Sequence, residues 1–315
     1  MRILLVVAYF IPEIGSAAHI YFDLAKAFVR RGHFVDVITS YPREFNLNEA
    51  DRGKEFPLEE EIEGITIYRC KHPAIRDNLF IRGLEHFYLP HYYFRKYREI
   101  DKKYDACLMY IPPLPLYYLA KKIKRHDGTP SVLNFQDFHP QELTDVGVLK
   151  SPVMIRILEY IEREAYKHAD YITVLSRSGI EYVQQRGADP ERVTHVFNSM
   201  SLSDADSLIQ SKDLKEEEGI ENKFLVSYAG ILSPYQGIDN ILDTAKALQD
   251  YDDIIFYIAG DGSEKQRLKE RIRQEEISNV RLLPLLPRAE YFNLVSSSDV
   301  SFISLDERMK APCLP

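Results

Sequence analysis

The sequence has little cysteine, no tryptophan and no long apolar segment. Cys70, Cys107 and Cys313 are odd in number and far apart, which excludes a zinc spacing or a disulfide framework and favours buried thiols in a reducing compartment. No stretch approaches the roughly 20 apolar residues of a membrane-spanning helix. The apolar run from Ile3 to Ile11 lacks a following small-residue cleavage site, so it predicts a buried strand rather than a signal peptide.

A net positive charge is also missing. The chain has 40 Lys and Arg residues against 48 Asp and Glu, a net charge of −8. This balance argues against general nucleic-acid binding, which usually needs a basic surface. No Gly-x-Gly-x-x-Gly follows the first strand, so the main sequence signal for binding a nicotinamide cofactor is missing. No Asp-x-Asp motif stands in a suitable loop, and we therefore expect no essential metal.

Apolar strands and helices alternate along the first part of the chain. Ile3 to Ala8 is continuous and apolar, as in a buried parallel strand. A helix from Ala17 to Phe28 and a strand from Val35 to Thr39 complete one right-handed βαβ unit. Further strands are expected at Ile65 to Arg69, Ala106 to Tyr110, Ser131 to Phe135, Tyr171 to Leu175 and Val193 to Phe197. This order predicts an α/β fold with a mostly parallel, doubly wound sheet.

A polar stretch from Ser201 to Lys223 interrupts the alternation. We place the domain boundary there, with an N-terminal domain at 1–200, a linker at 201–223 and a C-terminal domain at 224–315. The alternation restarts at Phe224 and gives four strands. The last of them, Val300 to Leu305, is followed by no predicted helix. Because both faces of a parallel sheet must be covered, the second domain is expected to be incomplete.

Glycine-rich turns follow strands in both domains. Gly15 and Ser16 lie between the first strand and the first helix, where close backbone approach and a helix start suit a phosphate. A simple turn with Ser16 as helix cap is the alternative. The candidate nucleotide-binding residues of the second domain are Gly230, Gln236, Gly237, Gly260, Asp261, Gly262, Leu286 and Pro287. Open α/β sheets bind ligands at the carboxyl ends of strands, so these loops favour a nucleotide.

Polar residues also gather after the strand Ser131 to Phe135. Asp137 and His139 are candidate acid/base or substrate-binding groups, and turn chemistry before a proline is the alternative. His19 lies one turn into the first helix and is either catalytic or an ordinary surface or core histidine. We assign catalysis to Asp137 and His19, and we place Gln136 and His139 with the Gly15 turn in the loops that bind substrate and phosphate.

The segment from Arg76 to Lys103 mixes aromatic and basic side chains in an otherwise acidic protein. We predict that it lies on one exposed face and rests on an anionic membrane surface. The alternative is a helix that packs through its aromatic residues and leaves its basic residues in water.

Together these residues resemble the retaining glycosyltransferases of family 4, which have the GT-B fold. The resemblance covers nearly the whole chain: residues 1–40, the stretch AYKHADYITVLSRSGIEYVQQRG, and the donor-half stretches YAGILSPYQG and FYIAGDGSEK. Ser176 and Asn198 match positions that recur in the family next to the acceptor side. The sequence looks most like the branch that builds capsule, O-antigen or exopolysaccharide.

The resemblance implies two Rossmann-like domains that face a cleft, with the acceptor on the first and the donor on the second. It implies transfer of a sugar from a nucleoside-diphosphate sugar to a glycan or lipid-linked glycan, with retention and no further cofactor. Helix starts and loop N–H groups would stabilise the leaving diphosphate. A sugar-nucleotide 2-epimerase on the same fold and a non-catalytic nucleotide-sugar-binding or scaffold protein remain the alternatives. The expected location is the cytoplasm, with the inner face of its membrane as an option.

The sequence departs from the family pattern at three places. Ile231 and Gln236 stand where many members carry a basic pair that holds the donor diphosphate, and Gln136 stands where many have a histidine. The chain ends at Pro315, where the family normally continues with a motif that contacts the donor sugar. We therefore expect the chain as given to be a poor catalyst.

Overall fold

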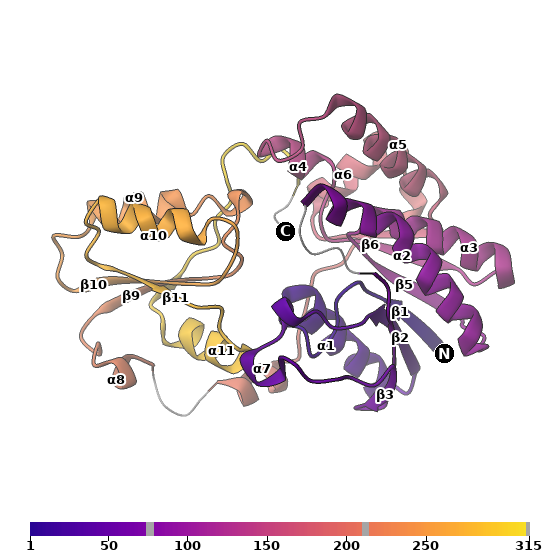
Figure 1. Cartoon of the computed structure of the whole chain (residues 1–315), viewed down its shortest axis with the longest axis horizontal. Coiled ribbons are helices and arrows are strands. Elements are labelled where there is room, and N and C mark those ends of the chain that lie inside the picture. The colour runs from indigo at the N-terminus through magenta and orange to yellow at the C-terminus, as the bar shows by residue number, and fades with distance from the viewer. Residues whose placement is uncertain (74–78, 210–213, 313–315) are drawn as a thin grey trace. The chain divides into compact units, whose positions relative to one another are not determined.

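The computed structural model describes residues 1–73, 79–209 and 214–312, which form two compact units (Figure 1). The first unit comprises Met1–Met200 and Lys310–Pro315, and the second comprises Ser201–Met309. Residues 310–312 thus belong with the first unit, whereas the predicted C-terminal domain extends over residues 224–315. Within the described part of the chain, none of the helices combines the length and apolar character needed to cross a bilayer.

The first unit is built on an eight-stranded sheet in the order β3-β4-β2-β1-β5-β6-β7-β8. All neighbouring strands are parallel except β3 and β4, which pair antiparallel at one edge. The predicted doubly wound parallel sheet is confirmed. The strands are β1 (Arg2–Val6), β2 (Phe34–Ser40), β3 (Glu59–Ile62), β4 (Ile65–Cys70), β5 (Ala106–Ile111), β6 (Ser131–Phe135), β7 (Tyr171–Val174) and β8 (Val193–His195).

Helices cover both faces of this sheet because successive side chains of each strand point to opposite sides. Leu4 and Val6 of β1 belong to the core beneath α2, α3, α5 and α6, and Ile3 and Leu5 belong to the core beneath α1. Cys107 is a buried free thiol in the first of these cores. The helices are α1 (Ser16–Arg30), α2 (Leu79–Ile100), α3 (Tyr117–Asp127), α4 (Gln141–Asp145), α5 (Pro152–His168) and α6 (Arg177–Gln185), with 3-10 turns at Glu44–Asn46, Glu49–Asp51, Leu114–Leu116 and Pro190–Arg192.

Helix α2 corrects the prediction for the aromatic and basic segment. Tyr93 and Tyr97 are buried in the core instead of lying on an exposed face. Lys102 is held at the sheet, where its Nζ lies 3.0 Å from Asp36 Oδ2. Arg95 and Arg98 are exposed. Residues 76–78 of the predicted segment lie outside the described residues. Tyr93 and Tyr97 therefore pack the helix onto the sheet, whereas Phe87 is 40% exposed.

The second unit has a parallel four-stranded sheet in the order β11-β10-β9-β12. Helices α9 and α10 pack on a core that includes Phe256, and Leu294 of α11 belongs to a separate core with Tyr257. The strands are β9 (Phe224–Ala229), β10 (Ile254–Ala259), β11 (Val280–Leu283) and β12 (Val300–Ser301), and the helices are α7 (Leu202–Leu208), α8 (Leu214–Glu218), α9 (Asp239–Ala247), α10 (Lys265–Gln274) and α11 (Arg288–Ser297), with a 3-10 turn at Pro234–Gln236.

Candidate functional site

The turn between β1 and α1 leaves the start of the helix open. Gly15 has φ 157°, and a Cβ added to it would meet no atom within 4 Å. Within the described chain no side chain caps the helix, and Ser16 is its first residue. The alternative interpretation of Ser16 as the cap is therefore wrong. The first backbone N–H groups of a helix lack intrahelical partners, so this turn can bind an anion. His19 lies half-buried one turn further along α1.

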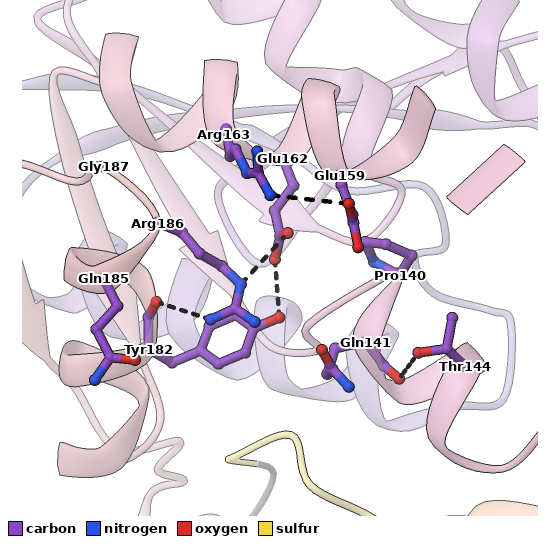
Figure 2. Close-up of a pocket in the computed structure, with 10 residues that line it drawn as sticks. All are labelled: Pro140, Gln141, Thr144, Glu159, Glu162, Arg163, Tyr182, Gln185, Arg186 and Gly187. Atoms are coloured by element: carbon purple, nitrogen blue, oxygen red, sulfur yellow. Dashed lines mark hydrogen bonds and ion pairs between the residues drawn. The ribbon is translucent and has the colours of Figure 1, made fainter. Parts of the chain in front are cut away.

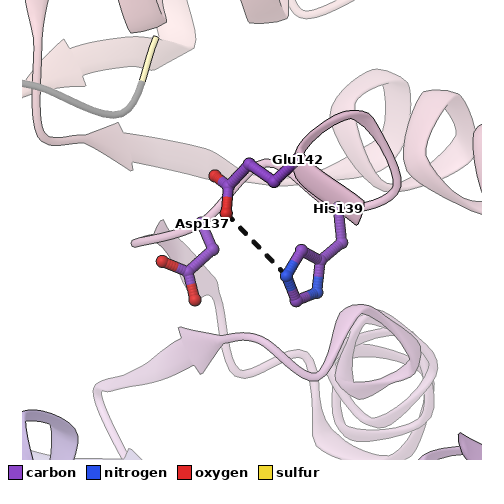
Figure 3. Close-up of side chains that lie close together, drawn as sticks. All are labelled: Asp137, His139 and Glu142. Carbon is purple, nitrogen blue, oxygen red and sulfur yellow. Dashed lines mark ion pairs between the residues drawn. The ribbon is translucent and has the colours of Figure 1, made fainter. Parts of the chain in front are cut away.

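Three ionisable side chains converge after β6 (Figure 3). Asp137, His139 and Glu142 each place one potential ligand atom within 4.8 Å of the others. His139 Nε2 lies 3.9 Å from Glu142 Oε2. The backbone N–H of Phe138 donates a 2.6 Å hydrogen bond to Glu142 Oε1, which fixes that carboxylate on α4. Asp137 and His139 were predicted as site residues, and Glu142 was not.

Burial sets the protonation of this group. It raises the pKa of Asp137 from 3.8 to about 6. Burial also lowers the pKa of His139, although the neighbouring Glu142 carboxylate acts in the opposite direction. Near neutral pH Asp137 is therefore mostly ionised and His139 is neutral, so both can accept a proton or a hydrogen bond. The same oxygen and nitrogen atoms are also the ligand types that could hold a divalent cation.

Gln136 and Asn198 form a reciprocal amide pair. Gln136 Nε2 donates to Asn198 Oδ1 at 3.1 Å, and Asn198 Nδ2 donates to Gln136 Oε1 at 2.7 Å. Gln136 also donates to Asn134 Oδ1 at 2.6 Å, which accepts a further hydrogen bond from the Tyr21 hydroxyl at 3.2 Å. This chain of amides joins α1, the end of β6 and the segment after β8. Two of the predicted acceptor-loop residues thus lie together.

Ser176, predicted to lie at the acceptor side, is the N-cap of α6. Its buried Oγ accepts a 2.9 Å hydrogen bond from the Gly179 N–H and caps α6. The same hydroxyl donates to the carbonyl oxygen of Pro312 at 3.2 Å. The hydroxyl is therefore engaged with protein groups, and capping explains a serine at this position.

The glycines after β9 and β10 allow two loops of the second unit to pack together. A Cβ on Gly260 would lie 1.9 Å from the Gly230 carbonyl oxygen, and one on Gly262 would lie 2.2 Å from that of Leu232. Leu232 N–H donates to the Asp261 carbonyl oxygen at 2.9 Å. Steric exclusion of any side chain therefore explains both glycines, whether or not a ligand binds beside them.

The other predicted donor-binding residues lie in the same loops or after β11. Gly237 adopts φ 54° after a half-buried Gln236, and a Cβ on it would approach the Leu305 carbonyl oxygen to 2.9 Å. The exposed Asp261 side chain accepts a 2.8 Å hydrogen bond from the Gly262 N–H. Pro287 precedes α11 as its N-cap, and Leu286 packs on the neighbouring core.

A buried ionic cluster that sequence reasoning missed lies beyond the carboxyl ends of β1 and β2. Glu13 Oε1 accepts hydrogen bonds from Asn46 Nδ2 at 3.0 Å and from the Arg43 N–H at 3.3 Å. The Arg43 side chain forms an ion pair with Glu85 of α2 and donates to the Tyr9 hydroxyl at 3.2 Å. These contacts hold the residues that precede Gly15. The only signal in the sequence is a lone carboxylate, Glu13, in an otherwise apolar segment.

A polar pocket of about 570 Å³ lies between α4, α5 and α6 (Figure 2). The guanidinium of Arg186 lies 3.6 Å from the centre of the Tyr182 ring. The Tyr182 hydroxyl donates to Glu162 Oε1 at 3.1 Å. Burial raises the pKa of Glu162 to about 7. No residue predicted as a site residue lines this pocket, so we do not assign it to the candidate site.

Two parallel doubly wound units, each with open or glycine-rich loops at the carboxyl ends of its strands, define the GT-B class of fold. The chain belongs to the glycosyl transferase 4-like family: the model of the glycosyl transferase 4-like domain matches residues 15–198. The model of the glycosyl transferases group 1 matches residues 210–307. The predicted family and fold are thereby confirmed.

Individual relatives are distant. The chain is 22% identical over 298 residues to WcaI of Escherichia coli K12, which is named as a colanic acid biosynthesis glycosyl transferase. The aligned region includes 90% of this chain and 72% of WcaI. Sucrose-phosphate synthase from Thermosynechococcus elongatus has a similar structure, with a TM-score of 0.75, 12% identity, and 96% of this chain and 75% of that one covered. HepE from Anabaena, solved with UDP-glucose, gives a TM-score of 0.63 at 16% identity, covering 96% and 73%.

Proposed function

We propose that the chain transfers a sugar from a nucleoside-diphosphate sugar to a glycan or lipid-linked glycan, with retention at the anomeric carbon. The observation that carries this proposal is the open start of α1 at Gly15, an anion-binding arrangement inside the segment that matches the glycosyl transferase 4-like domain. UDP-glucose in the HepE structure supports a nucleotide-sugar donor. The name of WcaI supports a role in cell-surface polysaccharide synthesis.

The proposed chemistry breaks the bond between the anomeric carbon and the diphosphate and forms a new glycosidic bond on the same face of the sugar. The leaving diphosphate takes the proton of the attacking hydroxyl. Asp137 accepts a hydrogen bond from that hydroxyl and orients it, and His19 assists at the reacting centre. Backbone N–H groups of the Gly15 turn stabilise the negative charge that develops on the diphosphate. The loops containing Gly230 and Gly260 bind the donor.

The experiment is incubation with a panel of nucleoside-diphosphate sugars and glycan acceptors, followed by NMR of the product's anomeric linkage. A product with the donor's anomeric configuration supports the proposal. Epimerised donor without an acceptor would identify the 2-epimerase instead. Tight donor binding with no turnover, in the presence of an acceptor used by a related enzyme, would identify a binding or scaffold protein.

We also propose that transfer needs no metal. Turnover should remain within about twofold in excess EDTA, because helix N–H groups rather than a cation stabilise the diphosphate. Loss of activity in EDTA that Mg²⁺ or Mn²⁺ restores would contradict this. Asp137, His139 and Glu142 would then be the first ligands to test, since their ligand atoms lie within 4.8 Å of one another.

A further inference from the structure

Helix α5 exposes a row of apolar side chains. Val153, Ile157 and Tyr160 are 67%, 44% and 63% exposed. They are four and three residues apart, so they lie on one side of the helix. Ile161 and Ala165 are buried in the core. The exposed row is therefore not needed to attach α5 to the sheet. A contiguous exposed apolar surface of this kind usually marks a contact with a membrane or another protein.

The neighbouring helix α3 extends this surface and gives it positive charge. Tyr118 is 36% exposed. Helix α3 connects β5 to β6 and α5 precedes β7, which pairs with β6, so the two helices follow neighbouring strands. Burial is the main cause that raises the pKa of Tyr118, and the Tyr160 phenol and the Glu164 carboxylate act in the same direction. Both helices contribute buried side chains to the same core. The α3 sequence has four basic residues, Lys121, Lys122, Lys124 and Arg125, against the single carboxylate of Asp127.

The charged groups around the row are mixed, but the exposed balance is basic. On α5, Arg156 is exposed. Arg163 Nη2 lies 3.8 Å from Glu159 Oε2, and His168 Nε2 lies 3.4 Å from Glu164 Oε2. Lys124 of α3 pairs with Asp170. Lys121 lies one turn from Tyr118 on α3, and Arg125 is exposed about one turn further along the helix. This local excess occurs in a chain with a net charge of −8.

We propose that the surface formed by Val153, Ile157, Tyr160 and Tyr118, with Lys121, Arg125 and Arg156, docks on a bilayer that contains anionic lipids. Apolar side chains would enter the headgroup region while basic side chains meet the lipid phosphates, the arrangement of interfacial helices. Charge complementarity selects an anionic bilayer over a second copy of this acidic chain. The biological purpose, access to a lipid-linked acceptor, rests on the proposed function, but the docking itself does not require catalysis.

The absence of tryptophan provides a direct test with the full chain. Tyr160→Trp introduces one fluorescent reporter into the surface. Tyr251→Trp is the matched control, because Tyr251 is 58% exposed and lies beside Asp250 and Asp252 in the second unit. With phosphatidylglycerol vesicles, emission of Tyr160→Trp should shift to shorter wavelength and be quenched by brominated lipid. Emission of Tyr251→Trp should not change, and neither variant should respond to pure phosphatidylcholine.

A second pair of variants tests the side chains themselves. Ile157→Glu should weaken vesicle co-sedimentation about tenfold, because a charge replaces an inserted apolar group, whereas Ile157→Val should change it little. Circular dichroism checks that both variants fold. Absence of binding to phosphatidylglycerol vesicles at low salt would overturn the proposal. So would a concentration-dependent dimer that Ile157→Glu dissociates. Intact sugar transfer to a soluble acceptor in either case would leave the proposed function standing.

Discussion

Asp137 is a residue whose protonation can be followed in a pH profile. Burial raises its pKa to about 6, so the carboxylate required to orient an acceptor hydroxyl is lost as the pH falls through about 6. We expect kcat/KM of the wild-type protein to decrease on the acid side of that value. Asp137→Asn should lower kcat/KM by roughly 100-fold and remove this acid limb. The measurement is kcat/KM between pH 5 and 8.5.

The control for this prediction is Asp250→Asn, which makes the same chemical change at an exposed position of the second unit. It should leave both the rate and the shape of the profile unchanged. If the acid limb persists in Asp137→Asn, another group is responsible for it and Asp137 is not the titrating residue.

For Glu13 we predict an effect on stability rather than on activity. Burial raises its pKa from 4.5 to about 7 despite hydrogen bonds from Asn46 and the Arg43 N–H. A carboxyl group with a raised pKa binds a proton more tightly in the folded state, so its contribution to stability is full below about pH 4.5 and is lost as the pH rises through about 7. Glu13→Gln cannot ionise. The wild type loses stability between pH 5 and pH 8 and the variant does not. The unfolding free energy of Glu13→Gln minus that of the wild type should therefore be about 2 kcal/mol larger at pH 8 than at pH 5.

Urea unfolding at the two pH values measures this difference. Glu49→Gln serves as the control, because Glu49 is exposed in the 3-10 turn at Glu49–Asp51. A constant difference between Glu13→Gln and the wild type across this range would show that Glu13 is not buried as an uncharged group at low pH.

At the scale of elements, alanine variants of two glycines with the same φ allow the cost of backbone strain to be distinguished from the cost of a steric clash. Gly15 and Gly260 both have φ 157°, but an added Cβ meets open space at Gly15 and lies 1.9 Å from a carbonyl oxygen at Gly260. Backbone strain is similar in the two alanine variants and cancels in the comparison. We expect Gly260→Ala to destabilise the protein by roughly 2 kcal/mol more than Gly15→Ala, because the two loops must separate.

Activity provides the second half of this comparison. Gly15→Val should reduce turnover by more than its loss of thermal stability can explain. The side chain would occupy space that the anion needs at the start of α1. Parallel loss of turnover and thermal stability in Gly15→Val would leave Gly15 with the role of a turn former only.

The strands were the most predictable elements. Strand β6 was predicted with the bounds observed, Ser131–Phe135, because a strand buried on both faces of a parallel sheet appears in the sequence as an apolar-rich run between turns. Strand β3 was missed because its sequence EEEI has neither an apolar run nor alternation. The last predicted strand ends at Ser301 rather than Leu305, since only two residues pair with β9.

Side-chain environment was less predictable, because it depends on contacts between distant parts of the sequence. Asp137 and His139 could be found from their position after a strand. Glu142 became part of the group only through the short helix α4. Composition could not show that Tyr93 and Tyr97 face the core rather than the solvent. A core helix and an interfacial helix can contain the same aromatic and basic residues.

At the scale of the whole molecule, the two units have separate hydrophobic cores with no residue in common. We therefore expect unfolding in more than one step, as is usual for proteins with several domains. Tyr160→Trp reports on the first unit and Tyr251→Trp on the second. In urea titrations, their fluorescence transitions should have different midpoints.

Added substitutions identify each transition. Gly260→Ala should move the midpoint reported by Tyr251→Trp, and Glu13→Gln should move the one reported by Tyr160→Trp. If each substitution moves both midpoints equally, the two units unfold as a single cooperative body.

The acidic edge strand has a consequence for how these molecules behave when crowded. Glu59 and Glu61 are exposed on β3, and Glu60 is paired with Arg69. A second chain that added its own β3 would bring two rows of carboxylates to within about 5 Å of each other. Like charges on neighbouring strands repel, so this end of the sheet offers a poor template for polymerisation. Chains concentrated on one surface can remain separate molecules instead of joining edge to edge into fibres.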